Sequence, residues 1–128
     1  MACIDVELAA GWVTLDPEVP FACPADLSRG AWVITAYNPA ANRVDAATNA
    51  ARQAELAAEL RSALVAHPGG ETRPAVGRNA SGSWQEPSFA VSGLPEPAVL
   101  ALARRFGQDA VFRIDAEGIE IVPAEEPP

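Results

Sequence analysis

The sequence predicts a single α+β domain, a two-layer fold in which two helices cover one face of an antiparallel sheet. Residues 30–122 read as strand, helix, strand, strand, helix and strand, followed by a further strand that closes a C-terminal hairpin. This order is typical of the split β-α-β, ferredoxin-like architecture. The 128 residues and the hydrophobic content of 49% are sufficient for one core. We expect residues 1–29 to be an N-terminal arm packed on this domain, and residues 123–128 to be a disordered acidic tail.

The first strand of the domain is predicted at residues 31–37, which are aromatic and β-branched and almost free of charge. This composition indicates a central strand that is covered on both faces. Asn38-Pro39 ends the strand, because proline offers no N–H donor and restricts the residue before it. In the preceding arm, residues 12–15 are compatible with a short strand, and we expect Trp12 and Phe21 to pack on the domain.

A long helix is predicted at residues 46–66, with Asp45 as its N-cap. Leu56, Leu60 and Leu64 form its apolar stripe. Extended backwards at helical spacing, the stripe reaches Asn49. An unsatisfied buried amide costs about 1–3 kcal/mol. We therefore expect Asn49 to be buried and hydrogen-bonded near Asn38.

The next two segments are predicted to be strands. Residues 72–76 contain a proline and are expected at the edge of the sheet. Residues 84–92 form the longer strand, which places Trp84, Glu86 and Ser88 on one face because side chains alternate along a strand.

The C-terminal third is predicted to be a helix followed by a hairpin. The helix begins at Pro95 or Pro97, and Gly107 caps its C-terminus. The hairpin joins residues 110–114 to residues 119–122 through a tight turn.

Charge and composition exclude several classes of function. The net charge is −8, and neither residues 1–28 nor residues 114–128 contain a basic residue, so we expect no binding to nucleic acid. The nine basic residues are all arginines, which excludes Schiff-base chemistry and a phosphate-loop lysine. Because no apolar run is long enough for a bilayer and the N-terminus lacks secretory features, we expect a cytoplasmic protein without membrane contact.

The sequence indicates neither a cofactor nor a metal centre. Cys3 and Cys23 form no CxxC pair, and His67 is the single histidine, so structural zinc is not expected. Glu86 with Asp45 or Asp109 offers oxygen ligands for a hard cation, but their spacing does not predict a site.

Polar residues at the ends of the predicted core elements are the candidates for a ligand-binding site. They are Asn38, Asn49, Glu86, Ser88, Arg105 and Gln108. Polar groups that converge on one pocket are typical of ligand sites. Each residue also has a structural alternative: a turn for Asn38, and a connection between helix and strand for Gln108. Glu86 is either a solvated strand residue, an ion-pair partner of Arg104 or Arg105, or a general base.

Serine and cysteine hydrolase chemistry is not predicted. Ser88 lacks a nucleophile elbow, and His67 is expected at a helix end away from it. Arg78 follows Gly77 without the strand-loop-helix context of a phosphate loop, although its guanidinium is suited to an anionic ligand.

Several short segments together resemble a bacterial family known as domain of unknown function 3293. The resemblance covers residues 30–114 and rests on Ile34-Thr35-Ala36-Tyr37-Asn38-Pro39, Asn49, Arg52, Gly77-Arg78, Glu86-Pro87-Ser88-Phe89, Arg105-Phe106-Gly107-Gln108 and Ala110. It implies a small cytoplasmic bacterial protein, and it supplies no activity and no catalytic residues.

The sequence favours a binding or regulatory module with a small polar pocket. A small enzyme with Glu86 as general base is one alternative, and an adaptor that binds a protein partner through its sheet face and acidic tail is another. No feature indicates an oligomeric state.

Overall fold

A computed structural model of the chain describes residues 2–17, 23–39 and 42–124. Its elements are β1 (Ala2–Leu8), β2 (Gly11–Leu15), η1 (Ala25–Leu27), β3 (Ala31–Ile34), α1 (Ala46–Val65), β4 (Glu71–Asn79), β5 (Gln85–Ser92), α2 (Glu96–Arg105), β6 (Ala110–Asp115) and β7 (Gly118–Pro123).

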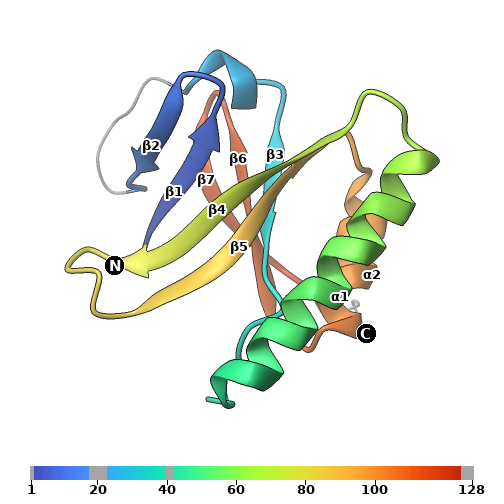
Figure 1. Cartoon of the computed structure of the whole chain (residues 1–128). Coiled ribbons are helices and arrows are strands. Elements are labelled where there is room, and N and C mark those ends of the chain that lie inside the picture. Colours follow the sequence, from blue (N-terminus) through green and yellow to red (C-terminus); the bar gives the residue numbers. More distant parts are fainter. Residues whose placement is uncertain (1, 18–22, 40–41, 125–128) are drawn as a thin grey trace.

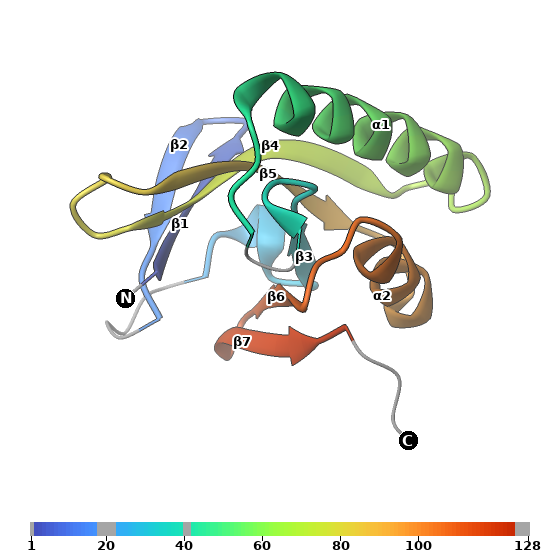
Figure 2. The ribbon, with the colours of Figure 1, turned by 90° about the horizontal axis from the view of Figure 1, so that it is seen from below.

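The strands of the described residues form one antiparallel sheet, in the order β2-β1-β4-β5-β3-β6-β7. The sheet curls into a half-barrel, with α1 lying along β4 and β5 and α2 beside β3 and β6 (Figure 1, Figure 2). The prediction of a two-layer ferredoxin-like domain is therefore wrong. The fold has seven strands in its described part, and strands dominate it.

The N-terminal residues account for much of this difference, because they add two strands to the sheet. β1 pairs with β4 from Ala2↔Asn79 to Val6↔Ala75, and β2 pairs with β1. Trp12 lies on the edge strand β2 and is 53% exposed, so the predicted packing of residues 1–29 through Trp12 is wrong. Phe21, the second predicted contact, lies outside the described residues.

β4 is longer than predicted and lies inside the sheet, between β1 and β5. Pro74 is the reason for the prediction of an edge strand, and the register explains why it is tolerated. The pairing with β1 ends at Ala75, so Pro74 lies beyond that ladder and pairs only with Phe89 of β5, and proline is tolerated where a strand has a partner on one side only.

The core has two apolar clusters. The helices contribute Leu56, Leu60, Val99, Ala103 and Phe106 to the first, together with Trp32, Ile34, Val91 and Val111 of the sheet. The second lies within the curl of the sheet and includes Ile4, Val6, Leu27, Val33, Ala90 and Ile114. All four residues of β3 are buried, which confirms the prediction of a central strand covered on both faces.

The helices and the hairpin follow the sequence pattern. α1 begins after Asp45, whose side chain accepts a hydrogen bond from the backbone N–H of Thr48 at 3.3 Å, and this confirms the predicted N-cap. α2 begins after Pro95, and β6 and β7 pair as a hairpin through the turn at Gly118.

The first two residues of the predicted C-terminal tail belong to the folded structure. Pro123 pairs with Ala110 at the end of the hairpin. Ala124 is fully buried, donates its N–H to the carbonyl of Asp109 at 2.9 Å and accepts from Arg104 Nη1 at 2.8 Å. Residues 125–128 lie outside the described part of the chain.

Removal of residues 123–128 is therefore expected to lower the melting temperature by several degrees. The truncation removes both Ala124 hydrogen bonds, each with a net contribution of about 0.5–1.5 kcal/mol. A loss of 1 kcal/mol corresponds to a shift of about 4 °C in a domain of this size. Thermal unfolding measures the effect. A chain that ends at Ala124 is the matched control, and an equal loss in both truncations would assign the effect to residues 125–128 instead.

Candidate functional site

The segment that follows β3 is held by side chains of α1. Pairing of β3 with its neighbours ends at Ile34, so the peptide groups of the next residues need other partners. Gln53 Oε1 accepts the N–H of Ala36 at 2.9 Å, and Arg52 Nε donates to the carbonyl of Ala36 at 3.2 Å. Gln53 Nε2 also donates to the carbonyl of Pro87 on β5 at 3.0 Å.

The connection between α2 and β6 is tied to the same segment. Gln108 Nε2 donates to the carbonyl of Tyr37 at 3.0 Å and to that of Phe106 at 3.3 Å. Arg52 Nη2 donates to the carbonyl of Phe106 at 2.6 Å, with its guanidinium 5.8 Å from the centre of the Phe106 ring. Gln108 and Arg52 are therefore occupied with backbone carbonyls and fix the position of this loop.

Asn38 and Asn49 form a reciprocal pair at the N-terminal end of α1. Asn49 is buried; its Oδ1 accepts the N–H of Asn38 at 2.9 Å, and its Nδ2 donates to Asn38 Oδ1 at 3.0 Å. This confirms the prediction that Asn49 is buried and bonded near Asn38. Asn38 adopts a left-handed backbone conformation, with φ of 45°, which asparagine tolerates better than most residues.

The side-chain amide nitrogen of Asn38 is hydrogen-bonded to Glu86. Asn38 Nδ2 donates to Glu86 Oε1 at 3.1 Å, while Asn38 Oδ1 also accepts the N–H of Val44 at 3.1 Å. Glu86 is half-buried and has no ion-pair partner among the described residues. Burial raises the pKa of Glu86, and the hydrogen bond from Asn38 offsets only part of this effect.

Asp5 shows the opposite arrangement for a partly buried carboxylate. Its oxygens accept from Arg78 Nε at 2.7 Å and Nη2 at 3.2 Å, and from Thr14 Oγ1 at 2.6 Å. Burial alone would raise the pKa of Asp5, but the bonds from Arg78 and Thr14 leave it below its usual value. Arg78 Nη1 also donates to two carbonyls, so the anion clamp considered for Arg78 is occupied by the protein itself.

Glu86 opens onto a hollow of about 210 Å³, which we call the Glu86 hollow. It is lined by Asn38, Arg43, Trp84 and Glu86. Trp84 is 42% exposed and lies two residues before Glu86, on the same face of the β5 segment. Neither Trp84 nor Arg43 was among the predicted site residues, although the alternation along the strand already placed Trp84 beside Glu86.

The other predicted site residues do not line the Glu86 hollow. Ser88 is buried and donates its hydroxyl to the carbonyl of Glu86 at 3.1 Å. Arg105 pairs with Glu59 at 3.1 Å and with Glu55 at 3.6 Å, both on α1. Glu86 is therefore not the structural partner of Arg105, and its bonded neighbour is Asn38.

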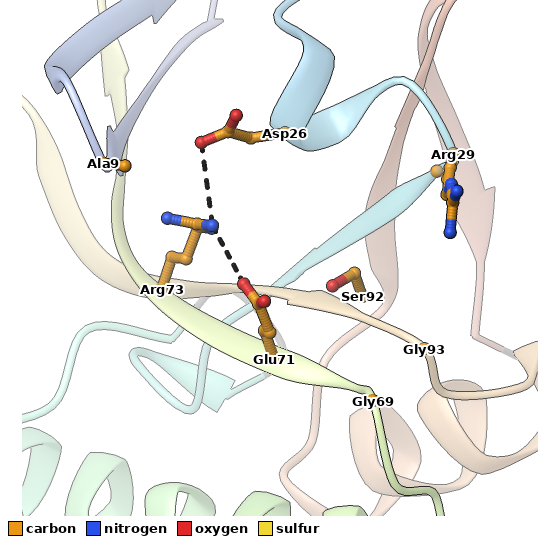
Figure 3. Close-up of a pocket in the computed structure, with 9 residues that line it drawn as sticks. Ala9, Asp26, Arg29, Gly69, Glu71, Arg73, Ser92 and Gly93 are labelled. Atoms are coloured by element: carbon orange, nitrogen blue, oxygen red, sulfur yellow. Dashed lines mark hydrogen bonds and ion pairs between the residues drawn. The ribbon is translucent and has the colours of Figure 1, made fainter.

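A second hollow, of about 580 Å³, lies where the ends of β4 and β5 meet η1 (Figure 3). Arg73 lies between two carboxylates, with Nη2 at 2.9 Å from Glu71 and 3.6 Å from Asp26. Arg29 lies apart from this trio (Figure 3). The charged groups in the centre of this hollow pair with one another, which distinguishes it from the Glu86 hollow.

Within the described residues, no three or more histidine, cysteine, aspartate or glutamate side chains form a group that could hold a metal ion. Cys3 and Cys23 are free thiols. Among the described helices, α1 and α2 included, none combines the length and the apolar character that crossing a membrane requires.

A family model described as "Protein of unknown function (DUF3293)" matches residues 34–111, which is more than half of the chain. The chain belongs to this family. The matched range begins within β3 and includes Asn38, Asn49, Glu86 and Gln108. No curated protein and no solved structure gives a significant match.

Proposed function

We propose that this member of the family is a binding module that holds a small polar ligand in the Glu86 hollow. One observation leads to this proposal: the half-buried Glu86 carboxylate faces the hollow with Asn38 as its single hydrogen-bond donor among the described residues. A carboxylate can accept more hydrogen bonds than one, and a ligand donor would supply them.

The surroundings of Glu86 support a preorganised site. Asn49 and Val44 fix both the backbone and the side-chain oxygen of Asn38, so its Nδ2 is directed at Glu86 before any ligand arrives. Groups that are fixed in advance lose little conformational entropy on binding. Asn49, Arg52, Gln53 and Gln108 act in this proposal as positioning residues rather than ligand contacts.

Replacement of Glu86 by glutamine is expected to lower the affinity for the ligand at least about tenfold and to preserve the fold. The amide keeps the shape and removes the charge. Titration of small polar fragments, followed by the NMR signal of the Trp84 indole N–H, measures binding in the wild type and in Glu86→Gln. Glu7→Gln, an exposed glutamate of β1, is the matched control. Fragments that shift Trp84 equally in all three proteins would refute a role for the Glu86 charge.

The same variant has an expected pH signature in stability. Because the folded state raises the pKa of Glu86 above 4.5, ionisation of this group costs stability as pH rises from the unfolded value through the folded one. Glu86→Gln is therefore expected to gain stability relative to the wild type as the pH rises above the ordinary pKa of a glutamate carboxyl, as measured by urea unfolding.

General-base catalysis is the second candidate function, and the raised pKa of Glu86 favours it. In that case the wild type converts a bound compound over time in the NMR sample and Glu86→Gln does not. Unchanged spectra of every bound compound support the binding module.

We further propose that the protein is bacterial and cytoplasmic. The family resemblance supports the first part, and the net charge of −8 is compatible with a solvated protein that repels nucleic acid.

A further inference from the structure

Two opposite charges line the Glu86 hollow without pairing with each other. Glu86 and Arg43 both contribute to its wall, yet neither has an ion-pair partner within the described residues. Elsewhere, Asp5 pairs with Arg78, Glu71 with Arg73, and Glu59 with Arg105. The hollow therefore presents one unpaired anion and one unpaired cation to whatever occupies it.

From this arrangement we infer that the ligand is a small zwitterion, such as an α-amino acid. The inference rests on the proposed function. The ligand ammonium group donates to the Glu86 carboxylate, and the ligand carboxylate accepts from the Arg43 guanidinium. Charge-assisted hydrogen bonds of this kind are about twice as strong as neutral ones.

Trp84 adds an apolar surface to the same hollow. Its exposed indole provides a face for the ligand ammonium, because aromatic rings attract cations through their quadrupole, and for an apolar ligand side chain. Asn38 holds Glu86 from the protein side. The ligand thus meets a cation-accepting half, formed by Glu86 and Trp84, and an anion-accepting half, formed by Arg43.

The two halves contribute unequally. Glu86 is half-buried, whereas Arg43 is exposed, and exposed ion pairs are weakened by solvent and salt. The ligand ammonium is therefore the stronger determinant of affinity. A compound with the ammonium alone binds more weakly than the zwitterion, and a compound with the carboxylate alone does not bind, because Glu86 repels it.

Three matched compounds test this order: alanine, ethylamine, which lacks the carboxylate, and propionate, which lacks the ammonium. Each is titrated at pH 7 into the full-length protein, and the Trp84 indole signal is followed by NMR. We expect saturable shifts with alanine, weaker binding of ethylamine and no response to propionate. Glu86→Gln should lower the affinity for alanine at least about tenfold, as loss of a partly buried charge pair does.

Arg43→Gln separates the two halves of the site. In this variant alanine is expected to bind only as well as ethylamine, and ethylamine is expected to keep its wild-type affinity. Arg29→Gln is the matched control, since Arg29 is an exposed arginine that lines the other hollow. It should leave every titration unchanged.

The outcomes distinguish this inference from the proposed function. If other fragments shift Trp84 in a Glu86-dependent manner but alanine does not, the zwitterion inference is wrong and the binding module stands. Binding of propionate, or equal binding of alanine and ethylamine, also overturns the inference. If no compound of any class shifts Trp84, the proposed function fails as well. Loss of alanine binding in Arg29→Gln would move the site to the Arg73 side of the sheet.

Discussion

Replacement of Asn49 by leucine is expected to lower the free energy of unfolding by about 1–3 kcal/mol, which is the cost of one polar group left without a partner. Leucine removes the acceptor for the Asn38 N–H and one of the two donors to Asn38 Oδ1, which keeps the N–H of Val44. These groups lie at a turn that other side chains hold in place. Urea unfolding of the wild type and the variant gives the difference directly.

Asn42→Leu is the matched control for this experiment, because it makes the same substitution at an exposed asparagine of the neighbouring loop. A surface change of this kind is expected to alter stability by less than about 0.5 kcal/mol. Similar losses in both variants would show that the Asn38–Asn49 pair contributes nothing particular. The Asn49 variant should also weaken ligand binding, because Asn38 would no longer be directed at Glu86.

Local periodicity made Asn49 predictable. The stripe of Leu56, Leu60 and Leu64 defines the buried face of a helix, and helical spacing extends that face to Asn49 without reference to the rest of the fold. The N-cap at Asp45 and the hairpin turn at Gly118 are local signals of the same kind. Such features depend on residues only a few positions apart, so the sequence displays them directly.

The N-terminal strands show what local patterns cannot supply. From Ile4 to Leu8, buried residues alternate with less buried ones as in a strand, but the partner of this strand is β4, some seventy residues along the chain. Strand pairing at such a distance is a property of the tertiary structure, and three prolines within Pro17–Pro24 favour a loop at the local level.

The candidate site was partly predictable, and for a physical reason. The sequence identified Asn38 and Glu86 as polar residues at the ends of core strands, and the structure joins them at 3.1 Å. The sequence alone could not distinguish an amide that binds a ligand from one that binds a backbone carbonyl, because the side chain of Gln108 has the same donors in both cases. Arg43 lies in the loop before α1 and lines the Glu86 hollow. This loop has no regular periodicity from which the position of Arg43 could be predicted.

Replacement of Gly93 by alanine is expected to cost about 2–5 kcal/mol of stability, from the combination of a left-handed backbone, about 1–2 kcal/mol, and overpacking, about 1–3 kcal/mol. Gly93 follows β5 with φ of +85°, and a Cβ there would lie 2.5 Å from the Cα of Gly70. The atom that would be struck belongs to the backbone, just before β4 begins, and cannot rotate away. Chemical unfolding measures the loss.

Gly69→Ala isolates the steric part of this cost. Gly69 lies close to Gly93 (Figure 3) and has φ of +93°, but a Cβ at this position meets nothing within 4 Å. This variant is expected to lose only the backbone contribution of about 1–2 kcal/mol. The excess loss in Gly93→Ala then measures the close approach of the β4 and β5 ends, the contact that brings Ser92 and Glu71 into register. Equal losses in the two variants would mean that these ends separate at little cost, and the packing of the sheet at this point would have to be assigned to its side chains alone.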